Sequence, residues 1–112
     1  IRKNMKKFNL KDMIGGWFVG DFEPTIIKTD KSEVAIKKYQ KGHYEKMHHH
    51  KLADEITVLV SGKAKMNDEI VFSNDILLIE KNESTDFTAL EDCITVVFKT
   101  GSFRNDKYLD NN

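Results

Sequence analysis

Short runs of apolar and β-branched residues, separated by turn residues every few positions, dominate this sequence of 112 residues. No window shows a sustained helical periodicity with caps, and only one proline and six glycines interrupt the chain. The runs predict strands at residues 17–19, 25–28, 33–39, 43–50, 55–60, 63–66, 69–72, 76–80, 85–89 and 94–99. Asn67-Asp68 joins two very short strands as a hairpin tip, and strands linked this closely pair antiparallel. The sequence therefore predicts an all-β protein, a small antiparallel sandwich or barrel.

The length and the charge of the chain limit its class. Its 112 residues fit one domain, and we expect a barrel over residues 14–103 between an N-terminal tail (1–13) and a C-terminal tail (104–112) that frays. Lysine plus arginine equals aspartate plus glutamate at 18 each, so no overall positive field exists to hold a nucleic acid. The longest aliphatic runs are far shorter than the roughly 20 residues that span a bilayer. We expect neither nucleic acid nor a membrane as a partner.

The number of cysteines indicates the cellular compartment in which the protein resides. Cys93 is the single cysteine, so it cannot form an internal disulfide, and the N-terminal residues do not resemble an apolar signal segment. These features predict a cytoplasmic protein. Cys93 follows Glu91 and Asp92, whose charges disfavour a thiolate, and it opens an apolar strand. We therefore expect a buried structural cysteine and not a nucleophile.

Two histidines and a carboxylate stand at set distances between Gly42 and Gly62. In an extended strand residues two apart point to the same side, so His48 and His50 can aim both imidazoles at one point while His49 faces away. Residues 51–54 are enough to turn the chain, and Glu55 can then return beside His50. Two imidazoles and a carboxylate on a rigid sheet form a candidate divalent-metal site.

This spacing resembles the first signature of the cupin family: Gly, any five residues, His-x-His, any three or four, Glu, any six, Gly. All five fixed positions are present, as Gly42, His48, His50, Glu55 and Gly62. The resemblance extends from Gly42 to about residue 89, and it implies a double-stranded β-helix, or jelly-roll barrel, with a metal inside. The histidine run lies within the domain, between patterned strands, which excludes an expression tag.

The second cupin signature is Gly, any five, Pro-x-Gly, any two, His, any three, Asn, and none of its fixed positions survives. The corresponding residues are Asn74, Glu80, Asn82, Thr85 and Ala89. Asn74 and Asn82 replace glycines, and asparagine tolerates the left-handed backbone that glycine supplies, so we expect both turns to be kept. Thr85 stands where the resemblance places the last imidazole. The neighbouring Asp86 could substitute, but alternation directs it to the other side of the strand unless a bulge intervenes. The site therefore lacks one ligand compared with the family signature, and one expected outcome is that it has lost its metal.

Three functional readings remain open. In the first, His48, His50 and Glu55 hold Fe, Zn, Ni or Mn, and the protein acts on a carbohydrate-like or organic-acid ligand as an isomerase, lyase or oxygenase. In the second, the barrel binds a small ligand or a metal as a sensor or carrier and catalyses nothing. The third is metal-free acid-base catalysis, similar to that of sugar-nucleotide epimerase cupins. It needs a histidine facing a tyrosine or lysine, and the available residue types are His43, Tyr44, Tyr39 and Lys38.

The strands at 56–60 and 94–98 carry apolar residues on both faces. One face can line the barrel while the other packs against a second subunit. In small cupins the N-terminal strand often crosses to a partner, and this makes Trp17, Phe18 and Phe22 interface candidates, with ordinary core positions as the alternative. Together these features predict a homodimer.

Overall fold

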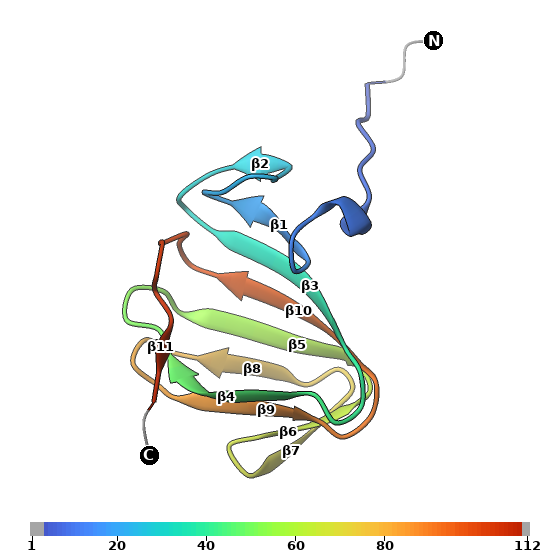
Figure 1. Cartoon of the computed structure of the whole chain (residues 1–112), viewed down its shortest axis with the longest axis vertical. Helices are drawn as coiled ribbons and strands as arrows, with labels where there is room; N and C mark the ends of the chain where they lie inside the picture. Colours follow the sequence, from blue (N-terminus) through green and yellow to red (C-terminus); the bar gives the residue numbers. More distant parts are fainter. Residues whose placement is uncertain (1–3, 111–112) are drawn as a thin grey trace.

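The computed structural model describes residues 4–110 (Figure 1). It contains one 3-10 turn, Leu10–Asp12, and short strands throughout the rest of this range. The strands are β1 (Trp17–Gly20), β2 (Ile27–Lys28), β3 (Glu33–Tyr39), β4 (Tyr44–His49), β5 (Glu55–Ser61), β6 (Lys63–Met66), β7 (Glu69–Phe72), β8 (Ile76–Ile79), β9 (Thr85–Ala89), β10 (Cys93–Lys99) and β11 (Tyr108–Leu109). Each predicted strand is present, so the all-β prediction is confirmed.

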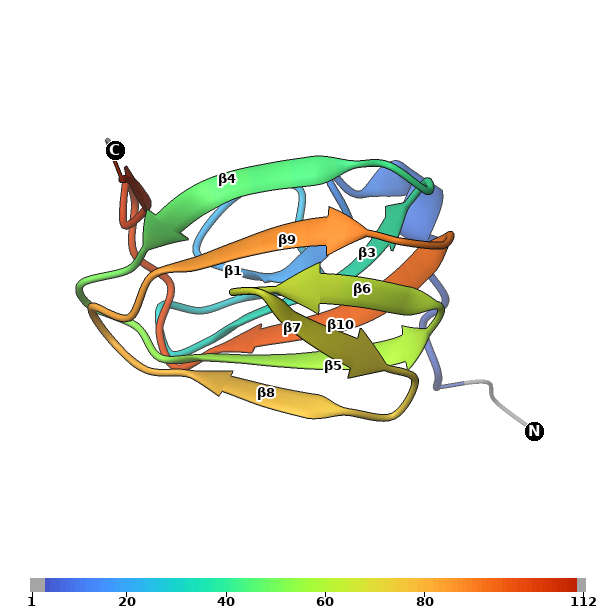
Figure 2. The ribbon, with the colours of Figure 1, turned by 90° about the horizontal axis from the view of Figure 1, so that it is seen from below.

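Two sheets face each other as layers (Figure 2). The larger sheet has the order β2-β1-β3-β10-β5-β8, and the smaller one has the order β11-β4-β9-β6-β7. Neighbouring strands pair antiparallel except β1 with β2. Strands that are consecutive in sequence often lie in opposite sheets, as β3 and β4 do, so the chain repeatedly crosses between the layers.

Asparagine provides most of the left-handed backbone that the tight turns need. Asn67 and Asp68 both have positive φ, 50° and 64°, and they form the tip of the predicted β6–β7 hairpin. Asn74 and Asn82 have φ of 77° and 69°, as expected for residues that replace glycines. At Gly62 only glycine fits, because φ is 98° and an added Cβ would collide with the carbonyl of Asp92.

The apolar core fills one end of the space between the sheets. Its buried residues are Leu59, Ala64, Met66, Val71, Ile79, Phe87, Ala89 and Cys93. Burial raises the pKa of the Cys93 thiol, whose Sγ donates to the carbonyls of Lys63 and Glu91. This agrees with the expected structural role of Cys93. Further along the same strands, polar side chains replace apolar ones, and the packed core gives way to a cavity.

The outer face of the larger sheet is apolar across four strands. Cross-strand neighbours lie on one face, so the register defines two rows of side chains. One row is Val34, Phe98, Ile56 and Leu78, and the other is Ile36, Val96, Val58 and Ile76. Ile76 and Leu78, on the edge strand β8, are 69% and 60% exposed. This surface is large and continuous for a sheet that faces water.

The ends of the chain differ in part from the expectation. The C-terminal tail (104–112) was expected to fray, yet Tyr108–Leu109 pairs with His48 and His49 as β11. The N-terminal tail (1–13) contains a 3-10 turn that Asn9 caps. Residues 1–3 and 111–112 of the two expected tails lie outside the described residues. Over residues 4–110, no helix has the length and apolar character needed to cross a membrane.

Candidate functional site

A cavity of about 420 Å³ lies between the two sheets, beside the apolar core. The strands alternate, so every second residue of β3, β5 and β10 points into it. These residues include Glu33, Lys37, Tyr39, Glu55, Thr57, Thr95, Val97 and Lys99. Trp17, Phe22 and Phe87 add aromatic surface. The size is that of a pocket for a small molecule.

A bulge in β4 determines which of its side chains reach the cavity. The pairing with β9 shifts by one residue between Glu45, which is opposite Phe87, and His48, which is opposite Thr85. Simple alternation would place Glu45 on the opposite face from His48 and His50. With the bulge all three line the cavity. The predicted orientation of the His48 and His50 pair is therefore retained, and Glu45 is an addition.

A hydrogen bond to the backbone of β4 orients the His48 ring. Its Nδ1 donates to the carbonyl of Lys46 at 2.9 Å, which leaves Nε2 with its lone pair. The rings of His48 and His50 meet edge to face with centroids 5.4 Å apart. An imidazole that donates through one nitrogen to a carbonyl is typical of a metal ligand, so His48 fits that role.

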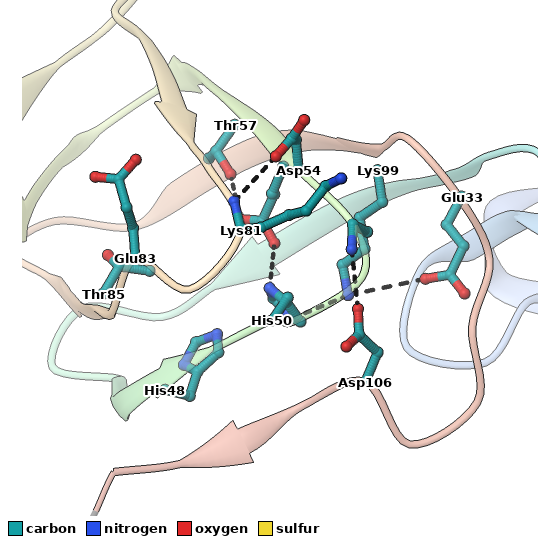
Figure 3. Close-up of polar contacts among 12 residues, drawn as sticks. Glu33, His48, His50, Asp54, Thr57, Lys81, Glu83, Thr85, Lys99 and Asp106 are labelled. Atoms are coloured by element: carbon teal, nitrogen blue, oxygen red, sulfur yellow. Dashed lines mark hydrogen bonds and ion pairs between the residues drawn. The ribbon is translucent and has the colours of Figure 1, made fainter.

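His50 has different neighbours (Figure 3). Its Nε2 lies 3.3 Å from the Lys99 Nζ, and its Nδ1 lies 4.0 Å from the Glu55 Oε1. Glu55 also accepts a hydrogen bond from the Thr57 hydroxyl at 2.8 Å. Since an ammonium can only donate, the lone pair of His50 Nε2 is directed at Lys99. Burial and the charge of Lys99 lower the pKa of His50 to about 4, so its ring is neutral near pH 7.

The arrangement of His48, His50 and Glu55 does not fit a bound metal as it stands. All three line one cavity, as predicted, yet among residues 4–110 no three His, Cys, Asp or Glu side chains converge as a metal-binding group. The nitrogen of His50 with the lone pair faces an amine. A metal held by these residues would require Lys99 to move. Metal binding through the three residues stays a prediction.

Thr85 takes the position of the last metal ligand of the family signature, as the sequence indicates. Thr85 is buried, lies directly opposite His48 and lines the cavity, but its hydroxyl donates to the carbonyl of Asp86. The Asp86 carboxylate accepts from the backbone of Asn67 at 2.8 Å, so it does not replace the missing imidazole.

Apart from Tyr39, sequence reasoning did not identify the groups of β3 and β10 in this cavity. Burial lowers the pKa of Lys37, whose Nζ lies over the Trp17 ring, 5.3 Å from its centroid. Thr95 lies opposite Lys37, is 1% exposed, and has no hydrogen-bond partner for its hydroxyl within the described structure. Alternation in the predicted strands 33–39 and 94–99 places such side chains on one face, so the signal was present.

Of the four residues suggested for acid-base chemistry, one lines the cavity and three do not. Tyr39 lines the cavity and donates to Glu45 at 3.3 Å, and burial followed by the charge of Glu45 raises its pKa. Lys38 and Tyr44 are exposed. The ring of His43 packs against Tyr39, and His43 is exposed and does not line the cavity. The four suggested residues do not meet in one site, although other histidines and lysines line the cavity together.

Two further expectations concern individual side chains. His49 was expected to face away from the site, and its Nδ1 contacts Asp110 at 2.7 Å while its ring stacks on Tyr108. Trp17 and Phe22, suggested as interface residues, line the cavity. Their contribution to a subunit interface stays a prediction, as does that of Phe18.

Solved structures similar to this one have the same architecture. A protein from Klebsiella pneumoniae with a double-stranded β-helix domain aligns over 100% of this chain and 98% of its own, with a TM-score of 0.72 and 15% identity. A cupin-2 domain protein from Shewanella frigidimarina aligns over 65% and 74%, with a TM-score of 0.55 and 17% identity. The capsular polysaccharide assembling protein CapF from Staphylococcus aureus aligns over 77% of this chain and 29% of its own, with a TM-score of 0.63 and 23% identity.

No protein-family model matches the sequence, and no curated protein matches it. The structural similarities nevertheless agree with the first sequence signature and with the two-sheet architecture. The protein has the double-stranded β-helix, or jelly-roll, fold of these structures, so the predicted fold is confirmed.

Proposed function

We propose that this protein binds a small carbohydrate-like molecule in the cavity between its sheets. The observation that carries the proposal is the Thr95 hydroxyl, which is buried, lines the cavity and has no partner among the described residues. A buried polar group without a partner costs free energy, and a bound hydroxyl or an ordered water would remove that cost. Thr95 is thus positioned to meet a polar ligand.

The composition of the cavity wall favours a polyhydroxylated ligand over a simple organic acid. Apart from Asp86, whose carboxylate binds the backbone of Asn67, the wall contains four carboxylate residues, Glu23, Glu33, Glu45 and Glu55, and three lysines, Lys37, Lys99 and Lys107. This balance does not favour a multiply charged anion. A sugar offers hydroxyls that both donate and accept, and these match the mixed carboxylate and ammonium groups. The similarity to a capsular polysaccharide assembling protein is consistent with this ligand class.

Intrinsic fluorescence can test the proposal, because Trp17 is the single tryptophan of the chain and lines the cavity. The probes are neutral hexoses, uronic acids, nucleoside-diphosphate sugars and dicarboxylates, each titrated separately. We expect a saturable change with a sugar or sugar acid and none with dicarboxylates. Lys37→Met should weaken the response, and the exposed Lys38→Met is the matched control. Saturation by dicarboxylates alone would instead support the organic-acid reading, and no saturation by any sugar probe would contradict ours.

Proton transfer without a metal is a second candidate function. It is supported by the presence of Lys37 and His50 in one cavity, where burial lowers the pKa of both groups. A sugar with a carbonyl group has an acidic neighbouring C–H, whose exchange in D₂O is followed by NMR. If the cavity catalyses proton transfer, the protein accelerates this exchange and Lys37→Met abolishes the effect. Binding by fluorescence without exchange would assign a carrier or sensor role.

Dimer formation is a separate part of the same proposal, whereas divalent-metal binding stays an untested alternative. Three potential ligands share the cavity, which keeps the metal reading testable by elemental analysis of wild type, His48→Ala and His50→Ala. The two apolar rows on the outer face of the larger sheet support a homodimer in which a second copy covers this face.

A further inference from the structure

We propose that the Lys99 ammonium is the resident cation of this cavity, and that it closes the His48, His50 and Glu55 set to divalent metals. The latent metal site would then be opened by a single substitution. The inference is independent of which small molecule the cavity binds.

The register places Lys99 between two carboxylates. Lys99 of β10 is directly opposite Glu33 of β3 on one side and Glu55 of β5 on the other. Its side chain is 16% exposed, and its Nζ lies 3.8 Å from the Glu33 Oε1. A buried ammonium requires a compensating charge, and the Glu33 carboxylate supplies it.

Glu33 is itself held in place. Its Oε2 accepts a hydrogen bond from the Ser102 hydroxyl at 2.7 Å, and the Ser102 Oγ accepts from the backbone N–H of Asp21 at 2.8 Å. Ser102 is buried. These contacts fix the Glu33 carboxylate, and Figure 3 shows Lys99 between Glu33 and His50. The position of Lys99 is therefore built into the fold.

Lys99 competes with a metal in two ways. Its Nζ is 3.3 Å from His50 Nε2, so it uses the lone pair that a metal would need. It also places a positive charge where a divalent cation would sit, and like charges at this distance repel strongly in a partly buried site. His48 retains a directed lone pair, and Glu55 lies beside His50. Two of three ligands are thus available, and the third is blocked.

A factorial set of variants tests the inference with Co²⁺ as the probe, followed by its visible absorption and by equilibrium dialysis. The variants are Lys99→Met, Thr85→His and the double variant, and the exposed Lys81→Met is the matched control. Thr85→His restores an imidazole opposite His48, at the position of the missing ligand. Thermal unfolding of each variant verifies that it is folded.

We expect wild type, Lys81→Met and Thr85→His to bind Co²⁺ weakly at this site. Lys99→Met should bind at least about tenfold more tightly, and the double variant should be tighter still. Adding His50→Ala to Lys99→Met should remove the gain. Equal affinity in wild type and Lys99→Met would overturn the inference, as would tight binding by Thr85→His with Lys99 intact. A folded double variant without increased affinity would also overturn it. None of these outcomes depends on sugar binding, so the proposed function is judged separately.

Discussion

At the scale of single residues, the cavity combines groups that stabilise the fold with groups that do not. The Thr57 hydroxyl donates to Glu55, whereas the Thr95 hydroxyl, also buried in the cavity wall, has no partner within the described residues. His50 is buried as a neutral ring beside an ammonium. Such features cost stability in the free protein, and they are typical of positions that serve a ligand.

Thr95→Val should stabilise the free protein by about 1 kcal/mol, because valine has the same shape and removes a buried hydroxyl without a partner. The same substitution should weaken binding of the sugar probe about fivefold, since it removes one hydrogen-bonding group. Urea unfolding and Trp17 fluorescence measure the two effects. Thr57→Val is the matched control and should destabilise, because it leaves Glu55 without its donor. A loss of stability in Thr95→Val would contradict this account.

Acid should destabilise the protein through His50. Its folded-state pKa of about 4 lies below the ordinary 6.5, so at low pH the unfolded chain binds a proton that the folded chain does not. The free energy of unfolding of metal-free protein should be unaffected by this group above pH 6.5. It should fall between pH 6.5 and about 4, by on the order of 3 kcal/mol. His50→Gln should flatten this part of the profile, while the exposed His43→Gln should not. An unchanged slope in His50→Gln would show that the burial of His50 is not the cause.

At the scale of elements, the C-terminal segment fixes the turn between β4 and β5. The buried Asp106 carboxylate accepts hydrogen bonds from the backbone N–H groups of Lys51, Leu52 and Ala53 at 2.9 to 3.2 Å. This turn separates His50 from Glu55, so its shape determines how the two side chains meet. The strand pairing of β11 with β4 adds to the same attachment.

Asp106→Ala should lower the free energy of unfolding by about 2 to 3 kcal/mol, because it leaves three backbone N–H groups of the turn without their acceptor. Asp106→Asn retains one amide oxygen and should cost less. Asp68→Ala, at a side chain that is 96% exposed, is the control and should have little effect. Urea unfolding provides the measurement. A loss in Asp106→Ala no larger than in the control would mean that the C-terminal segment does not hold this turn.

The sequence predicted the elements whose signals are local. Alternation gave the strands and the shared face of His48 and His50, and asparagine indicated the turns at Asn74 and Asn82. The bulge that turns Glu45 inward depends on pairing with a distant strand, and local alternation contradicts it. The contact of Lys99 with His50 likewise depends on which strands become neighbours. The 104–112 tail is mostly polar, so its attachment through Asp106 had no local signal.

At the scale of the whole molecule, the two faces of the larger sheet have different roles. The inner face encloses the cavity, and the outer face presents two rows of four apolar side chains. Exposed apolar surface of this extent is uncommon in a monomer and common at subunit interfaces. The inner face is the site of the proposed ligand binding, and the outer face is that of the proposed homodimer.

Analytical ultracentrifugation should find wild type at twice the chain mass. The double variant Ile76→Lys and Leu78→Lys should be a folded monomer. Burying two charges at the interface would cost more free energy than the remaining contacts contribute. Leu52→Lys changes an exposed apolar residue in the β4–β5 turn and should remain dimeric. Wild type at the mass of one chain, or a double variant that remains dimeric, would contradict this interface.

The metal content of untagged protein purified without chelator tests the central claim most directly, namely that the cation of the His48, His50 and Glu55 cavity is Lys99. Elemental analysis should find well below one equivalent of Fe, Zn, Ni, Mn, Co or Cu per wild-type chain, and a clear increase in Lys99→Met. Near-stoichiometric metal in wild type, lost in both His48→Ala and His50→Ala, would contradict the account. The chain would then have a metal centre despite the threonine at position 85.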